Sequence, residues 1–80
     1  MDHAQIEERV VAAISTVLKR HFETVQQMTR EHAAEWDSLK HMEIMFVLED
    51  EFGTEFSEEE LADLDSASKI VSAIEAKHAA

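Results

Sequence analysis

Apolar residues recur every three to four positions along the first part of the chain, with charged and polar residues between them. This spacing places the apolar side chains on one face and predicts an amphipathic helix over roughly residues 3–20. That face consists of Ile6, Val10, Ile14, Val17 and Leu18. Asp2 and Gln5 have the spacing of a capping box that starts a helix. The expected last turn contains the basic residues Lys19, Arg20 and His21, which suit the negative end of the helix dipole.

The pattern loosens between Phe22 and Trp36, which predicts a long connection. Its apolar residues are expected to fold back onto the core; they include Phe22, Val25 and Met28. A second helix is predicted from about Ser38 to Phe52, ending near Gly53, because glycine readily adopts the left-handed conformation that terminates helices. We expect this helix to be the central one and its apolar residues to face the core. These residues are Leu39, Met42, Met45, Phe46, Leu48 and Phe52.

Two further helix starts follow. Ser57-Glu58-Glu59-Glu60 is an S-x-x-E capping box, and the flanking Phe56 and Leu61 occupy the positions of a hydrophobic staple. This third helix must be short, because Asp65-Ser66 already caps the next one. The last helix is expected to fray past Lys77, and one of its faces carries Ala67, Ile70, Val71 and Ile74.

These elements predict one all-α domain over residues 1–80. It is a four-helix bundle with three longer helices, one short third helix and a long first loop. Composition agrees, since one glycine and no proline leave few helix breakers. A core of this size leaves little room for a substrate cleft, which weighs against an enzyme with catalytic residues of its own. No apolar run reaches the ~20 residues of a membrane span, and the N-terminus lacks a signal peptide's apolar core. We therefore expect a soluble, cytoplasmic monomer.

The chain is strongly acidic, with 7 basic and 18 acidic residues and a formal net charge of −11. This charge repels nucleic-acid phosphates and excludes a nucleic-acid binder, whereas it favours protein partners with basic surfaces. Between His41 and Ser68 there is no lysine or arginine, which fits a docking face, although solubility alone is the alternative. No metal site is expected, because cysteine is absent, the histidines contain no H-x-x-x-H pair, and an EF-hand loop around Gly53 would place Leu48 and Phe52 at ligand positions.

The start of the second helix carries the most specific motif. Asp37-Ser38-Leu39 and the residues after it resemble the acyl carrier protein family, which includes peptidyl and aminoacyl carriers. The similarity covers nearly the whole chain. It continues through Glu43-Ile44, the run Leu48-Glu49-Asp50-Glu51-Phe52, Phe56, the run Glu58-Glu59-Glu60, Ile70 and Ile74.

The resemblance implies that Ser38 carries a 4′-phosphopantetheine arm. A phosphopantetheinyl transferase would take the arm from coenzyme A, using magnesium, and link it to the Ser38 hydroxyl as a phosphodiester. The thiol of the arm would then hold an acyl group as a thioester for partner enzymes. A helix N-terminus suits such a phosphate. Asp37 is expected to cap the helix and to assist the modification.

Two departures from the family pattern favour a specialised carrier of a dedicated biosynthetic pathway over fatty acid synthesis. Glu35-Trp36 replaces the glycine usual before the signature, and Lys40 and His41 follow it where fatty-acid carriers are acidic or neutral. We expect partner enzymes to dock on the exposed side of the second helix, at Leu39, Lys40, His41, Met42, Glu43, Glu49 and Asp50. We expect a bound acyl chain to be lined by Met42, Met45, Phe46, Leu61 and Ile70. The alternative is that these residues serve only as part of the hydrophobic core.

Other functions remain open. Asp37, Ser38 and His41 include the residue types of a hydrolytic triad, but no glycine lies near Ser38 to shape an oxyanion hole, so a hydrolase is disfavoured. Ser38 could also be a simple helix cap in a small helical interaction module that has no prosthetic group. Within the carrier interpretation, aminoacyl or peptidyl loading is the alternative to acyl loading.

Overall fold

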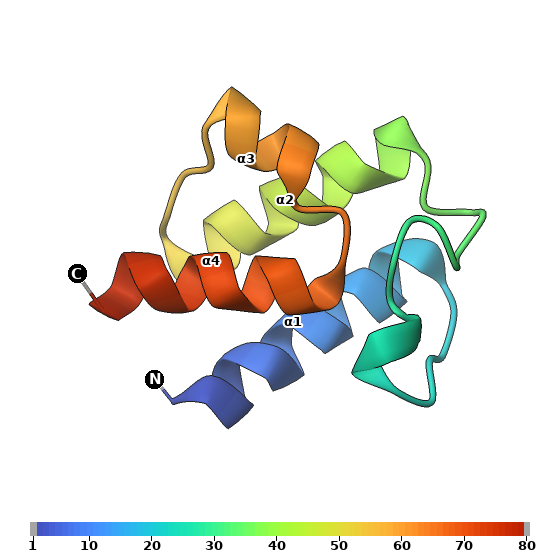
Figure 1. The fold of residues 1–80 in the computed structure, drawn as a ribbon, viewed down its shortest axis with the longest axis horizontal. Coiled ribbons are helices and arrows are strands. Elements are labelled where there is room, and N and C mark those ends of the chain that lie inside the picture. The colour runs from blue at the N-terminus through green and yellow to red at the C-terminus, as the bar shows by residue number, and fades with distance from the viewer. Residues whose placement is uncertain (1, 80) are drawn as a thin grey trace.

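The computed structural model describes residues 2–79, except the side chains of residues 78 and 79. Within these residues the chain forms four α-helices and one 3₁₀ turn, and no β-strand (Figure 1). In chain order they are α1 (His3–Leu18), η1 (Val25–Gln27), α2 (Ser38–Phe52), α3 (Glu58–Asp63) and α4 (Ala67–Ala79). The predicted fold class is confirmed, with three longer helices, a short third helix and a long first connection. None of the helices in this part of the chain is long and apolar enough to span a membrane.

The helix with the most extensive packing is α1, which contacts both α4 and α2. The prediction that the second helix is central is therefore wrong. The reason is that α2 buries only one face against the bundle, whereas α1 packs against two helices. The buried residues of α1 are Ile6, Val10, Ala13, Ile14 and Leu18.

The buried face of α2 differs from the predicted one. It consists of His41, Ile44, Met45, Leu48 and Phe52, which have the 3–4 spacing of one helix face. Leu39 and Phe46 were expected to face inward, but they are 69% and 57% exposed, and Met42 is half-buried. Positions 39, 42 and 46 also share a face, so α2 carries two apolar stripes, and only one of them packs on the core.

The helix starts follow the local rules. At α1 the Asp2 carboxylate accepts from the Gln5 backbone N–H (2.9 Å), and the Gln5 side chain accepts from the Asp2 N–H (3.2 Å). Ser57 and Glu60 form the same reciprocal pair at α3. Both capping boxes are confirmed. Ser66 caps α4, because its hydroxyl accepts from the backbone N–H of Lys69.

Of the helix ends, that of α2 agrees with the prediction, whereas those of α1 and α4 differ from it. Gly53 ends α2 in the left-handed conformation, as expected (φ 62°). However, α1 ends at Leu18, because Lys19 itself adopts a left-handed C-cap (φ 54°), so the basic residues expected in its last turn lie beyond the helix. At the other end of the chain, α4 continues to Ala79, past the point at which fraying was predicted.

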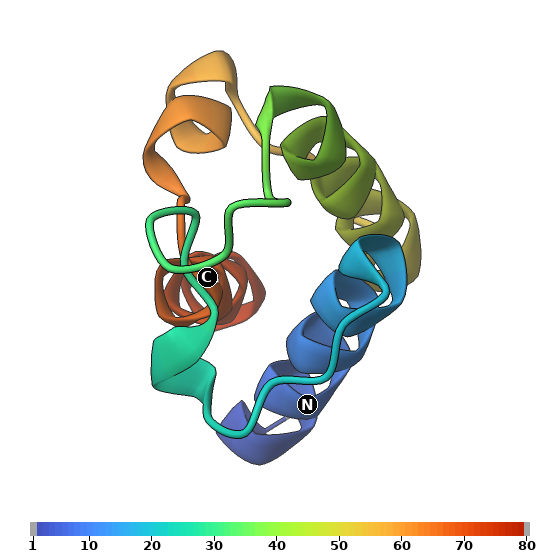
Figure 2. The ribbon, with the colours of Figure 1, turned by 90° about the vertical axis from the view of Figure 1, so that its right-hand side faces the viewer.

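The long connection between α1 and α2 packs across one end of the bundle (Figure 2). Phe22 and Met28 are buried as predicted, Val25 is half-buried, and Trp36 is also buried. The connection is joined to the α3–α4 turn by a short antiparallel bridge between Thr29 and Ser66. Two backbone bonds of 2.9 Å flank it; they run from Arg30 N to Asp65 O and from Ala67 N to Met28 O. These contacts hold the middle of the connection, residues 28–30, against the α3–α4 turn.

Candidate functional site

Ser38 is the first residue of α2, and its side chain is exposed. The capping role at this helix start belongs to Asp37, whose carboxylate accepts from the backbone N–H of Lys40 (2.9 Å). Ser38 is therefore not the helix cap, so helix capping does not explain a serine at this position. Its hydroxyl lies at the surface, where another molecule can reach it.

Arg30 lies beside this hydroxyl. Its Nη2 donates to Ser38 Oγ (3.5 Å), and its Nε donates to the carbonyl oxygen of Trp36 (3.3 Å). Sequence reasoning missed this residue, although Arg30 is the only lysine or arginine between Arg20 and Lys40. The structure thus adds a cation from the long connection to the expected site.

His41 is buried, with only 4% of its surface exposed, so its expected place on a docking surface is wrong. Its Nδ1 accepts from the Trp36 indole N–H (3.0 Å), because an indole nitrogen can only donate. Its Nε2 consequently carries the proton and donates to the Leu61 carbonyl oxygen (2.6 Å). The hydrogen bonds of the two ring nitrogens thus link α2 to the end of the long connection and to α3. His41 has no ring nitrogen left to act as a base for Ser38, and a hydrolytic triad finds no support.

Burial lowers the pKa of His41 below its usual value of 6.5, and the hydrogen bond to the Leu61 carbonyl opposes this effect only in part. The nearby Arg30 charge lowers the pKa further, whereas Asp65 raises it. The neutral ring is therefore the stable form in the folded protein.

The side of α2 that faces away from the core combines apolar and acidic side chains. We call it the outer face of α2; its members are Leu39, Glu43, Phe46, Val47 and Asp50, all exposed. The structure thereby brings together three of the residues expected to contact partners, and it adds two that sequence reasoning had not assigned to docking, Phe46 and Val47. An exposed aromatic ring beside aliphatic side chains is typical of a protein contact surface.

The remaining residues expected to contact partners are partly engaged within the chain. Lys40 is half-buried, and its Nζ lies 3.6 Å from a carboxylate oxygen of Glu43. Glu49 is half-buried and accepts from the backbone N–H of Phe56 (2.9 Å), so its carboxylate holds the α2–α3 loop. Met42 is half-buried as well. These three side chains border the outer face of α2 rather than form it.

The residues expected to line an acyl chain do not share one environment. Met45 and Ile70 are fully buried in the core, and Leu61 packs against it. Phe46 was expected to line an acyl chain, but this expectation is wrong because its side chain is exposed on the outer face of α2. The structure therefore shows a core role for Met45 and Ile70.

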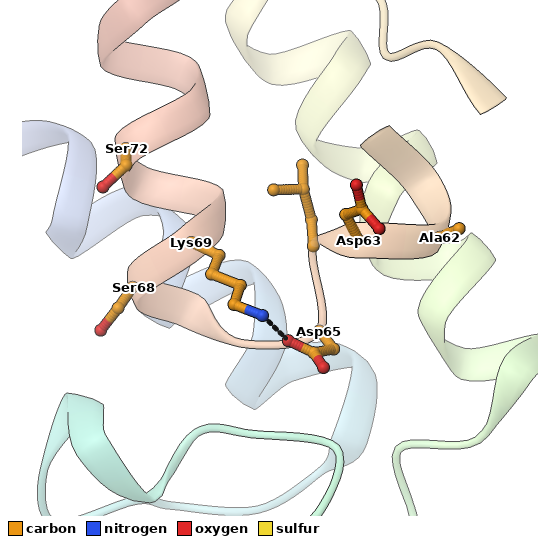
Figure 3. A pocket seen from close by; sticks show the side chains of 7 residues that line it. Ala62, Asp63, Asp65, Ser68, Lys69 and Ser72 are labelled. Atoms are coloured by element: carbon orange, nitrogen blue, oxygen red, sulfur yellow. Dashed lines mark ion pairs between the residues drawn. The ribbon is translucent and has the colours of Figure 1, made fainter. Parts of the chain in front are cut away.

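A hollow of ≈ 610 Å³ lies elsewhere, between the end of α3 and the first turns of α4 (Figure 3). An ion pair lies at this hollow, between Lys69 Nζ and Asp65 Oδ1 (3.0 Å). This hydrogen bond from Lys69 is the main reason that the pKa of Asp65 lies below its usual value. None of the expected acyl-chain residues borders this hollow.

No family model matches this sequence, and neither a curated protein nor a solved structure matches it. The function must therefore be inferred from the residues of the site themselves.

Proposed function

We propose that this protein is a carrier that bears a 4′-phosphopantetheine arm on Ser38 and presents thioester-bound acyl intermediates to partner enzymes. The observation that supports this most strongly is the Ser38 hydroxyl, which lies exposed at the first residue of a long helix while Asp37 does the capping. Such a hydroxyl is accessible to a modifying enzyme.

The residues around Ser38 fit a phosphodiester. Backbone N–H groups of the first turn of α2 and the helix dipole both favour an anion at this position. The Arg30 guanidinium adds a positive charge beside the hydroxyl oxygen. When bound, the arm supplies a thiol that holds the acyl group as a thioester, which the cysteine-free chain itself has no means to do.

The modification forms one new covalent bond, between the Ser38 hydroxyl oxygen and a phosphorus of coenzyme A. Ser38 Oγ bonds to the phosphorus that carries the pantetheine, the bond from this phosphorus to the adenosine 3′,5′-bisphosphate of coenzyme A breaks, and the hydroxyl proton leaves to a base of the transferase. The chain contributes the nucleophilic oxygen and its position. Catalytic groups belong to the transferase and to the enzymes that load the arm.

Intact-mass measurement tests this proposal. Incubation with coenzyme A, magnesium and a broad-specificity phosphopantetheinyl transferase should add the mass of one phosphopantetheine to the wild type. Ser38→Ala should add none, because the accepting oxygen is gone. Ser72→Ala removes an exposed serine from α4 and should be modified like the wild type. An unmodified wild type with several transferases would contradict the proposal and favour the interaction module without a prosthetic group.

The outer face of α2 fits the surface that partner enzymes would contact while they reach Ser38. Leu39 follows Ser38 directly, and Phe46 lies two turns further along the same face. The acidic members, Glu43 and Asp50, would attract basic partner surfaces and raise association rates. Apolar residues at the centre and charges beside them match the general anatomy of a protein interface.

Phe46→Ala is therefore expected to raise the KM of the transferase for this protein by roughly tenfold, the usual scale for losing an aromatic contact at an interface. Stability should change by less than about 0.5 kcal/mol, because the ring is already mostly exposed. Initial rates at several protein concentrations provide the KM. The control is Glu8→Ala on the exposed surface of α1, which should leave the KM unchanged. Equal KM values for Phe46→Ala and the wild type would remove Phe46 from the docking surface.

A further inference from the structure

Arg30 forms no ion pair with a carboxylate among the residues that the structure describes, although the chain is rich in acids. By contrast, five other lysine and arginine side chains are paired with a carboxylate. The five pairs are Arg9–Glu51, Arg20–Glu35, Lys40–Glu43, Lys69–Asp65 and Lys77–Glu60. Lys19 likewise forms no ion pair within the described part of the chain, but its side chain is exposed to solvent. Arg30 is half-buried, and Asp65 interacts with its charge only through space, because the Asp65 carboxylate is paired with Lys69. A partly desolvated charge that no carboxylate contacts directly is costly.

The fold holds Arg30 in this place. Its backbone N–H donates to the carbonyl oxygen of Asp65 (2.9 Å), next to the bridge between Thr29 and Ser66. The nearest acidic side chain on that turn, Asp65, is already paired with Lys69 (3.0 Å). The Nε of Arg30 is bound to the Trp36 carbonyl, which leaves Nη2 directed at Ser38 Oγ. Nε and Nη2 lie on the same edge of the guanidinium, so this one edge spans the Trp36 carbonyl oxygen and the Ser38 hydroxyl.

We propose that Arg30 binds the phosphate attached to Ser38 and so fixes the position of the phosphate end of the arm. The identity of this phosphate as the phosphodiester of a pantetheine arm rests on the proposed function. The non-bridging oxygens of any phosphate ester on Ser38 lie one bond beyond a phosphorus that is itself bonded to Oγ. They therefore come within reach of the donor that now contacts this oxygen. Arginine suits the task, because its planar fork donates two parallel bonds to a phosphate.

This contact has a consequence for the carrier. A phosphate bound to Arg30 is fixed against the long connection, which is tied to the α3–α4 turn, instead of rotating about the Ser38 side chain. The arm then leaves the protein in a restricted set of directions. Arg30 is a positioning residue, since the chemistry of loading takes place at the far end of the arm.

Phosphoserine incorporated at position 38 by genetic encoding tests the contact without any transferase. The second ionisation of a phosphoserine has a pKa near 6, and its phosphorus resonance reports the titration directly. A neighbouring guanidinium favours the dianion, so the phosphate pKa in the otherwise wild-type protein should lie roughly 0.5–1 unit below that in the Arg30→Gln variant. Arg30→Lys keeps the charge but loses the fork and its anchor on Trp36, so its phosphate pKa should fall between these two values.

The matched control is Arg20→Gln, which removes a cation from the same connection but one that pairs with Glu35 (3.0 Å). Its phosphate pKa should equal that of the protein with both arginines. Equal phosphate pKa values with and without Arg30, or an equal shift in Arg20→Gln, would overturn the inference. Because this test needs no transferase, a shift specific to Arg30 in a protein that no transferase modifies would uphold the phosphate contact and contradict the carrier proposal alone.

Discussion

Replacing Trp36 with alanine is expected to lower the free energy of unfolding by about 3–5 kcal/mol. Only 2% of the Trp36 surface is exposed, so truncation removes a large buried ring and leaves a cavity between the long connection and α2. It also removes the indole N–H that donates to His41 Nδ1, and the buried imidazole loses one of its two partners. Domains of this kind are stable by only about 5–15 kcal/mol, so much of the total stability would be lost.

Denaturant unfolding followed by circular dichroism measures this effect. Phe46→Ala is the matched control, because it truncates an aromatic ring that is 57% exposed and should cost less than about 0.5 kcal/mol. Trp36→Phe should fall between the two, since it keeps most of the apolar volume but not the N–H donor. A loss in Trp36→Ala no larger than that in Phe46→Ala would contradict the packing described for Trp36.

Acidification from pH 7 to pH 5 is expected to destabilise the protein through His41. Its pKa is lowered in the folded state by burial, whereas the unfolded chain has the ordinary value of 6.5, so the unfolded state binds more protons. The stability due to neutral His41 is therefore fully present above about pH 6.5 and is lost as the pH falls through the folded pKa. A proton on Nδ1 would face the Trp36 N–H and break that bond.

His41→Gln isolates this contribution, because glutamine can accept from Trp36 and donate to the Leu61 carbonyl without titrating. Urea unfolding at pH 7, 6 and 5 should give a steeper loss of stability in the wild type than in this variant. His3 acts in the opposite sense: its hydrogen bond to Glu75 raises its pKa, so its contribution is present below pH 6.5 and is lost as the pH rises through the raised value. Parallel pH profiles for the wild type and His41→Gln would show that His41 is not the responsible group.

Features set by neighbouring residues could be predicted from the sequence. The capping boxes at Asp2 and Ser57 and the left-handed Gly53 depend on residues within one helical turn, so local chemistry determines them. The position of Ser38 at a helix start follows from the same rules. The class of fold could be predicted as well, because periodicity shows how many helices there are and roughly where they lie.

The orientation of α2 could not be predicted, because its two apolar stripes satisfy the helical period equally well. The stripe that packs inward includes His41, a polar residue whose burial becomes favourable only when Trp36 and the Leu61 carbonyl satisfy its ring nitrogens. Arg30 was missed for a similar reason. Its significance depends on contacts with Ser38 and Asp65, and the second of these is distant in the sequence.

The single tryptophan also gives this protein a built-in optical probe, since the chain contains no tyrosine to compete with it. Trp36 lies two residues before Ser38 and shares a hydrogen bond with His41, so its indole samples the interior directly beneath the site. A protonated imidazole quenches indole emission, and water that reaches the buried indole shifts that emission to longer wavelength. Intrinsic fluorescence of the unlabelled protein would therefore report, in real time, whether a partner or a modification at the surface disturbs the packing between the long connection and α2.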